Sequence, residues 1–274
     1  MRGPPNLCAS GTRCGGGAVS DRVAVVTGGN RGIGRAIAAA LAADGFAVAV
    51  TARDRTTAAD TVAAVQAGGG TAVALACDVS DEESVTAMAR EVGEFGPVHT
   101  VVANAGVAGP TAPLQEIAFV DWKDCLATDL DGVFLTFRAF VPELIAAGTG
   151  SLIAISSMTG KRPLHGRAPY AAAKMGVIGL VRTLALELGP HGVRVNAVCP
   201  GAVTGPRMDD VIRRQAETRG ITEAEARASF TAASPLNRLV EADEVAATCS
   251  FLASDAAASI TGEDLNVNAG VVMY

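Results

Sequence analysis

Short apolar runs alternate with segments of helical character along the chain from residue 21 onward. Each run is almost continuously apolar and is bounded by polar turns, which is typical of parallel strands buried on both faces. The strands predicted in this way are Val23–Thr27, Ala47–Thr51, Thr71–Ala76, Thr100–Ala103, Ser151–Ser156, Val193–Val198 and Leu265–Val267.

Helices are predicted between these strands, at Arg35–Ala43, Glu82–Val92, Asp121–Ala147 and Tyr170–Leu188. Regular alternation of strand and helix favours right-handed crossovers and a parallel sheet covered by helices on both faces. The sequence therefore predicts an α/β fold, a single domain with a doubly wound parallel sheet of the Rossmann type.

The interval Pro206–Leu236 stands apart because it reads as two short helices before the last strand. The first ends near Gly220, and the second follows Thr222, with Glu225 three residues later in the arrangement of a capping box. This insertion is either a helical lid that closes over a substrate or a rigid hairpin packed on the sheet edge. Both interpretations stay open.

Residues 1–20 show no periodicity, and no apolar stretch in them is long enough for a secretory signal. We predict a flexible tail, and a start codon assigned too far upstream is the alternative interpretation. The predicted domain is then 21–274. No run approaches the ~18 apolar residues that a membrane-spanning helix needs. The net charge of −6 and the pI near 5.1 disfavour nucleic acid as a partner.

The six cysteines include no C-x-x-C pair, and the three histidines show no metal-binding spacing. A redox or metal site is one interpretation of the cysteines. Small buried apolar side chains in a reduced cytosol are the better one, so we expect no metal and a cytoplasmic location.

A glycine-rich turn, Thr27–Gly34, follows the first predicted strand directly. Glycines there let the backbone approach a pyrophosphate, whose charge is met by the N–H groups of the next helix. An ordinary strand-to-helix turn also favours glycine, so the motif is informative because it directly follows the first predicted strand. The residues expected to contact a dinucleotide are Gly28, Asn30, Arg31, Gly32, Ile33 and Gly34.

The second strand points to the form of the dinucleotide. An acidic residue about 20 positions after the glycine turn binds a ribose 2′-hydroxyl, whereas arginine accommodates a 2′-phosphate. Ala52 occupies the acidic position, Arg53 follows it, and Arg31 adds a second cation. The arginines could simply be solvated, but together they favour NADP(H) over NAD(H).

Tyr170 and Lys174 lie four residues apart on a predicted helix, and hence on one face. A phenol ionises with a pKa near ~10, and a neighbouring ammonium favours its ionised form. Ser157, on the turn after a buried strand, could donate a hydrogen bond to a substrate oxygen. A tyrosine and lysine at this spacing are common on helices, but the serine and the glycine turn make coincidence improbable.

With these motifs in place, residues 21–274 resemble the classical short-chain dehydrogenase/reductase family. The resemblance implies a cofactor turn at Gly28, Gly32 and Gly34, and catalytic roles for Ser157, Tyr170 and Lys174, with Tyr170 and Lys174 also contacting the cofactor. It further implies cofactor contacts at Asp78, Val79, Asn104, Ala105, Gly106, Pro200 and Gly201.

Two positions depart from the family pattern. Asp129 stands where the family often has an asparagine that supports a proton relay, and it is a candidate catalytic residue. Unlike an asparagine, an aspartate donates a hydrogen bond only when it is protonated. After Pro200-Gly201, the position where the family often has threonine is Gly205, so Val203 and Thr204 become the candidate cofactor contacts.

These observations predict an oxidoreductase that transfers a hydride between NADP(H) and a ketone or secondary alcohol, with Tyr170 as acid/base. The resemblance points to 3-oxoacyl thioester or polyketide ketoreductases, or to sugar and polyol dehydrogenases. The alternative is a catalytically silent dinucleotide-binding regulator or scaffold. The expected partners are a small carbonyl or alcohol substrate and further copies of the chain. A homotetramer, or failing that a homodimer, would pair through Asp121–Ala147 and Tyr170–Leu188.

Overall fold

The computed structural model describes residues 22–274, so the predicted tail, with Cys8 and Cys14, lies outside the described part. Seven parallel strands form one sheet in the order β3-β2-β1-β4-β5-β6-β7. Their bounds are β1 Val23–Thr27, β2 Ala47–Ala52, β3 Ala72–Ala76, β4 Val98–Ala103, β5 Gly150–Ile155, β6 Val193–Pro200 and β7 Asp264–Val267.

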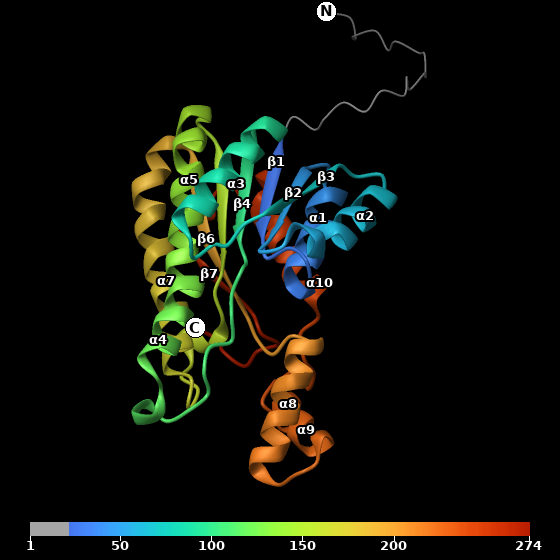
Figure 1. Cartoon of the computed structure of the whole chain (residues 1–274), viewed down its shortest axis with the longest axis vertical. Helices are drawn as coiled ribbons and strands as arrows, with labels where there is room; N and C mark the ends of the chain where they lie inside the picture. The colour runs from blue at the N-terminus through green and yellow to red at the C-terminus, as the bar shows by residue number, and fades with distance from the viewer. Residues whose placement is uncertain (1–21) are drawn as a thin grey trace, which may run out of the picture.

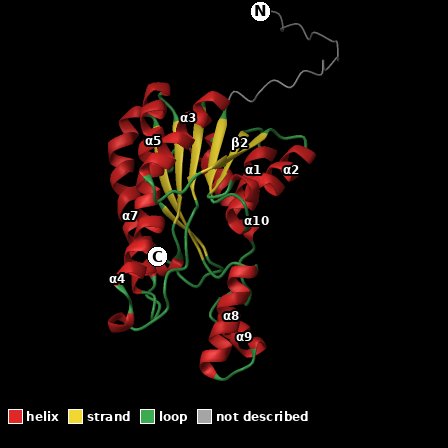
Figure 2. Ribbon diagram, viewed as in Figure 1, coloured by secondary structure: helices red, strands yellow, loops and turns green. Residues whose placement is uncertain are grey.

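Helices cover both faces of this sheet (Figures 1 and 2). One face carries α3 (Glu82–Phe95), α5 (Gly132–Ala147) and α7 (Ala168–Leu188), and the other carries α1 (Gly32–Ala43) and α10 (Ala242–Ala253). The predicted doubly wound parallel sheet is therefore confirmed. Because strand order reverses between β1 and β4, a crevice is expected where the carboxyl ends of these two strands separate.

The apolar strands form the core because both of their faces are buried. Residues of β1 alternate between two apolar clusters: Val23 and Val25 pack toward α3, α5 and α7, while Ala24 and Val26 pack toward α1 and α10. Phe137 of α5 is among the largest fully buried side chains. Both clusters close around small strand residues, which fits the low aromatic content of the sequence.

The segment that the sequence predicts as one long helix, Asp121–Ala147, is instead two helices. They are α4 (Phe119–Leu126) and α5, joined by a π-helical turn at Ala127–Asp131. The extra residue in such a turn changes which side chains face inward, and here it places Asp129 in the interior. The sequence prediction also missed α10 and α2 (Ala59–Ala67). The short α2 is rich in alanine, so apolar and polar positions hardly alternate along it.

The insertion consists of α8 (Pro206–Arg219) and α9 (Glu223–Ala232), which lie beyond the sheet at the same end as the carboxyl ends of the strands (Figure 1). The predicted capping box is present: Thr222 accepts a hydrogen bond from the Glu225 amide, and Glu225 accepts one from the Thr222 amide. Gly220 ends α8 in the left-handed conformation. Closure over a substrate stays a prediction. None of the described helices is long and apolar enough to cross a membrane.

Candidate active site

The glycine turn is joined to the end of β4 by a set of hydrogen bonds. Asn104 Nδ2 donates to the carbonyl oxygens of Thr27 and Gly28 at 2.8 and 3.1 Å, and the amides of Asn104 and Ala105 donate to Thr27 Oγ1. A Cβ atom on Gly34 would lie 2.3 Å from the Gly28 carbonyl oxygen, so this position has room only for glycine. The two predicted cofactor motifs therefore form one tightly built unit.

The cations predicted to select the cofactor lie beside this turn. Arg31 precedes α1 and Arg53 follows β2, and both side chains are exposed. The nearest carboxylate in sequence, Asp54, is occupied, because its Oδ1 accepts hydrogen bonds from the Thr56 amide and hydroxyl. No ion pair of Arg31 or Arg53 occurs within residues 22–274.

Asp78 and Val79 follow β3 on the same side. Hydrogen bonds from Ser80 hold the pKa of the Asp78 carboxyl below its usual value, against the opposing effect of burial, and the charge of Arg53 adds to the lowering. Asp78 is therefore a fixed anion near Arg53. Asn30, at the other side of the glycine turn, donates to Thr57 Oγ1 at 3.2 Å.

A buried ion pair lies at the centre of the site. Lys174 Nζ is 2.9 Å from Asp129 Oδ1, and the two side chains are 4% and 0% exposed. Lys174 Nζ also donates to the carbonyl oxygen of Ile155 at 3.0 Å, and Asp129 Oδ2 accepts from the Val107 amide at 3.1 Å. Although Asp129 Oδ1 makes no well-directed hydrogen bond, the adjacent ammonium balances its charge.

Room for this pair comes from Gly106, where a Cβ atom would lie 2.5 Å from Asp129 Oδ1. The neighbouring thiol of Cys125 is affected in turn: burial, and next the charge of Asp129, raises its pKa to about 11. The departure from asparagine at position 129 was visible in the sequence, but nothing there indicated that the aspartate would contact Lys174 directly.

Ser157 and Tyr170 are the other two residues of the predicted catalytic set. Ser157 Oγ accepts a hydrogen bond from the Thr159 amide at the start of α6 (Met158–Lys161), which leaves its proton available for donation. Tyr170 lies in the first turn of α7 and is partly exposed, with Lys174 Nζ 5.6 Å from the centre of its ring. The structure thus brings the three predicted catalytic residues to the carboxyl ends of β5 and its neighbours.

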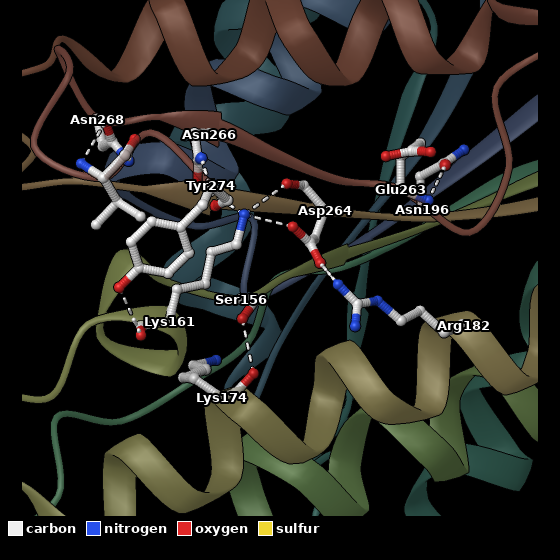
Figure 3. A network of polar contacts seen from close by, with 11 residues as sticks. Ser156, Lys161, Lys174, Arg182, Asn196, Glu263, Asp264, Asn266, Asn268 and Tyr274 are labelled. Carbon is white, nitrogen blue, oxygen red and sulfur yellow. Dashed lines mark hydrogen bonds and ion pairs between the residues drawn. The ribbon is translucent and has the colours of Figure 1, made fainter.

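A polar network that the sequence did not reveal fixes the turn after Ser157 (Figure 3). Lys161 forms an ion pair with Asp264 of β7, and the two side chains are only 7% and 9% exposed. Asp264 Oδ2 also lies 2.6 Å from Arg182 Nη2 of α7. Tyr274 donates through its hydroxyl to the Lys161 carbonyl oxygen at 3.3 Å. These residues are too far apart in sequence for spacing to pair them.

Arg167 is a further residue that sequence reasoning missed. It precedes α7, and its guanidinium carbon lies 4.9 Å from the centre of the Tyr170 ring. Its Nη2 donates to the Ala108 carbonyl oxygen at 2.6 Å. The sequence feature that could have pointed to Arg167 was its position three residues before Tyr170. Beside the loop that holds it is a cleft of about 280 Å³, lined by Val107, Gly109, Pro110, Asp121, Asp124 and Cys125.

The segment after β6 closes the site on the side of the insertion. A Cβ atom on Gly201 would lie 2.8 Å from Asn268 Cα, so the Pro200-Gly201 turn is packed closely against the chain after β7. Val203 forms an isolated parallel bridge with Val240. The Thr204 hydroxyl donates to Glu241, so this donor is already engaged, while Val203 and Thr204 keep their predicted place beside the turn.

The described cysteines have the environment expected of structural thiols. Cys77, Cys125, Cys199 and Cys249 are buried and free. Over residues 22–274, histidine, cysteine and acidic side chains form no group of three that could hold a metal ion.

A parallel sheet in this order, with a glycine turn after its first strand and a serine, tyrosine and lysine at its carboxyl edge, defines a Rossmann-type oxidoreductase. The chain belongs to the short-chain dehydrogenase/reductase family. The family model that matches it, over residues 28–272, is described as enoyl-(acyl carrier protein) reductase.

Characterised relatives cover nearly the whole chain. It is 40% identical over 257 residues to cis-4-hydroxycyclohexanecarboxylate dehydrogenase of Sinomonas cyclohexanicum, covering 93% of this chain and 98% of the relative. It is 38% identical over 260 residues to a 3-oxoacyl-[acyl-carrier-protein] reductase of Synechocystis sp., covering 94% and 99%.

Solved structures of oxidoreductases share this fold over nearly the whole chain. A single-residue variant of actinorhodin polyketide ketoreductase, with NADPH, superposes with a TM-score of 0.90 at 35% identity, over 94% of this chain and 99% of the other. Xylitol dehydrogenase bound to NAD⁺ superposes at 0.87 with 28% identity, over 92% and 99%. The chain is therefore an oxidoreductase of a family acting on CH–OH and C=O groups.

The buried ion pair generates a prediction about stability. Asp129→Ala should lower the free energy of unfolding by about 3–5 kcal/mol, because it leaves the Lys174 ammonium buried without its counter-charge. Asp131→Ala is the matched control: this carboxylate is exposed two residues away, so its loss should change stability by no more than ~0.5 kcal/mol. Urea unfolding followed by circular dichroism measures both. Equal effects would mean that the pair contributes nothing.

Proposed function

We propose that the protein is an NADP(H)-dependent oxidoreductase that interconverts a ketone and a secondary alcohol, with Tyr170 as the proton donor and acceptor. The observation that carries the proposal is the meeting of Tyr170, the buried Lys174 and Ser157 at the sheet edge beside the glycine turn. The family assignment supplies the reaction class, and these side chains supply the chemistry.

In the direction of reduction, the Ser157 hydroxyl donates a hydrogen bond to the substrate carbonyl oxygen and Tyr170 transfers its phenolic proton to it. Oxidation reverses this transfer. Lys174 lies beside the ring of Tyr170 and places a positive charge where a phenolate would form. Asp129 holds the ammonium in that position through the ion pair. Asp129 thus acts through Lys174, and the relay expected of an asparagine is replaced by a direct ionic contact.

The described residues fit a bound dinucleotide. Gly28 and Gly34 leave space at the turn that side chains would otherwise fill. A Cβ atom on Gly28, for example, would lie 2.9 Å from Ala105 Cα. The exposed N-terminus of α1 supplies amide donors for the pyrophosphate. When bound there, the nicotinamide supplies or accepts the hydride. Val79, Asn104–Gly106 and Pro200–Thr204 would border it.

The choice of NADP(H) rests on charge. Neither Arg31 nor Arg53 forms an ion pair within residues 22–274, and Asp54 is held by Thr56. An acidic residue in this place would repel a 2′-phosphate, whereas arginine pairs with it. The NADPH-bound ketoreductase neighbour supports this choice, and the NAD⁺-bound xylitol dehydrogenase stands against it.

Assembly through α4, α5 and α7 is also proposed. These helices expose large apolar side chains, including Phe119, Phe134 and Leu186. An apolar helix face needs cover, so a homotetramer, or failing that a homodimer, would bury it. The buried free thiols suit the cytoplasm proposed as its location.

Tyr170→Phe should reduce turnover by about 10²–10⁴-fold while NADPH still binds, because only the proton donor is removed. Ketone-dependent NADPH oxidation and the fluorescence of bound NADPH measure the two properties on the same preparation. Turnover close to that of the parent would exclude Tyr170 as the acid/base. If the parent itself reduces no acyl thioester, cyclic ketone or keto sugar, the alternative of a silent dinucleotide-binding regulator gains support.

The double variant Ala52→Asp, Arg53→Ala should shift the preference from NADPH toward NADH by about 10-fold or more. It removes a charge-assisted hydrogen bond to the 2′-phosphate and adds an acceptor for a 2′-hydroxyl. The ratio of kcat/KM for the two cofactors is the measurement. Arg90→Ala, on α3 away from the glycine turn, is the control and should leave the ratio unchanged. A parent that prefers NADH would refute the charge argument.

Phe134→Glu should weaken assembly, because it places a carboxylate in the proposed interface of α5. Leu236→Glu, at an exposed apolar position outside these helices, is the matched control. Sedimentation equilibrium at micromolar concentration should give four or two times the monomer mass for the parent and control. A monomeric parent would contradict the proposal.

A further inference from the structure

Arg167 occupies a position that the mechanism above does not use. It is the residue before α7, three positions ahead of Tyr170, and its guanidinium lies against the tyrosine ring with its carbon 4.9 Å from the ring centre. Its Nη2 is anchored on the Ala108 carbonyl oxygen. A cation is thus held against the ring of the proposed proton donor.

The hydrogen bonding of Arg167 is incomplete. A guanidinium carries five N–H donors, yet the Nε of Arg167 is buried without any partner among the described residues. No described carboxylate forms an ion pair with it, although the side chain is half-buried. Asp129, the nearest buried acid in the site, is already held by Lys174. A half-buried charge in this state is costly unless a counter-charge arrives.

A second arginine interacts electrostatically with the first. Arg207, in the opening turn of α8, is exposed. Burial lowers the pKa of Arg167, the charge of Tyr170 opposes this effect, and the charge of Arg207 adds to the lowering. Two other arginines of the insertion are neutralised by ion pairs: Arg213 with Asp210 and Arg227 with Asp209. Arg207 forms no such pair within residues 22–274. Two like charges that approach each other repel, and an anion between them turns this repulsion into attraction.

We propose that the site is built for substrates that carry an anionic group, a carboxylate or a phosphate, which is held between Arg167 and Arg207. The group binds on the side of Arg167 that faces α8, because Asp121 and Asp124 line the cleft on the side of Gly109. Since Arg167 comes from the body and Arg207 from the insertion, the same anion draws the two parts together. This inference rests on the proposed function, which places the reacting carbonyl at Tyr170.

The test compares charged ketones with neutral ones of the same shape. The probes are 4-oxocyclohexanecarboxylate against its primary amide, and fructose 6-phosphate against fructose. The parent should favour one anion over its neutral partner by ~10-fold or more in kcat/KM, and the preferred pair identifies the group as carboxylate or phosphate. Arg167→Gln and Arg207→Gln should bring this ratio toward one, mainly through KM. Arg167→Lys should restore part of it.

Arg219→Gln is the matched control, because Arg219 is an exposed arginine at the far end of the same helix and should keep the parental ratio. A parent with equal kcat/KM for both members of each pair would overturn the inference while leaving the proposed function intact. The inference also fails if Arg207→Gln, which alters only an exposed side chain, retains the full preference.

Calorimetry with cyclohexanecarboxylate against its amide, and with fructose 6-phosphate against fructose, in the presence of NADP⁺, separates this inference from the proposed function. If no ketone is reduced, the proposed function fails. Tighter binding of either anion that is lost in Arg167→Gln would still uphold the anion site. Binding that ignores the charge or the substitution would overturn it.

Discussion

Burial of the sheet on both faces is the constraint on which the rest of the structure depends. Strands β1, β2, β4, β5 and β6 are almost wholly enclosed, so polar chemistry has no place within the sheet. It is confined to the carboxyl edge, where strands end and loops begin. Asn104 illustrates how this edge is held together: one side-chain amide satisfies two carbonyl oxygens of the glycine turn and thereby joins β4 to β1.

At the centre of the site, neighbouring groups balance the charge of Lys174. A buried ammonium is stable there because a carboxylate and a backbone carbonyl oxygen face it. The π-helical turn at Ala127–Asp131 brings that carboxylate inward, and Gly106 leaves it room. The π-helical turn and the absence of a side chain at Gly106 thus both permit the ion pair between Asp129 and Lys174.

All seven strands were predicted from the sequence, because the burial of a short apolar run is a local property, whereas α2 and α10 were missed. Val23–Thr27 was found with its correct bounds, and the capping box was identified from two residues, Thr222 and Glu225, three positions apart. The π-helical turn escaped prediction because its residues are compatible with a regular helix, and only packing against Gly106 and Lys174 selects the wider turn. The motifs located Ser157, Tyr170 and Lys174.

What no motif could provide was the set of contacts between distant segments. The partners Lys161 and Asp264 are separated by more than a hundred residues. The proposed role of Arg167 depends on the ring of Tyr170 and on the charge of Arg207. Contacts of this kind follow from how the chain folds back on itself. They cannot be predicted from the spacing of residues along the sequence.

Asp264 has a wider consequence because its two oxygens reach two different segments (Figure 3). One oxygen binds Lys161, at the end of the turn that begins with Ser157, and the other binds Arg182, about two helical turns beyond Lys174 on α7. Substitutions at these three positions should therefore not combine additively, since each removes the same shared carboxylate contact. In evolutionary terms the triad would change as a unit: once Asp264 is lost, both cations become free to vary.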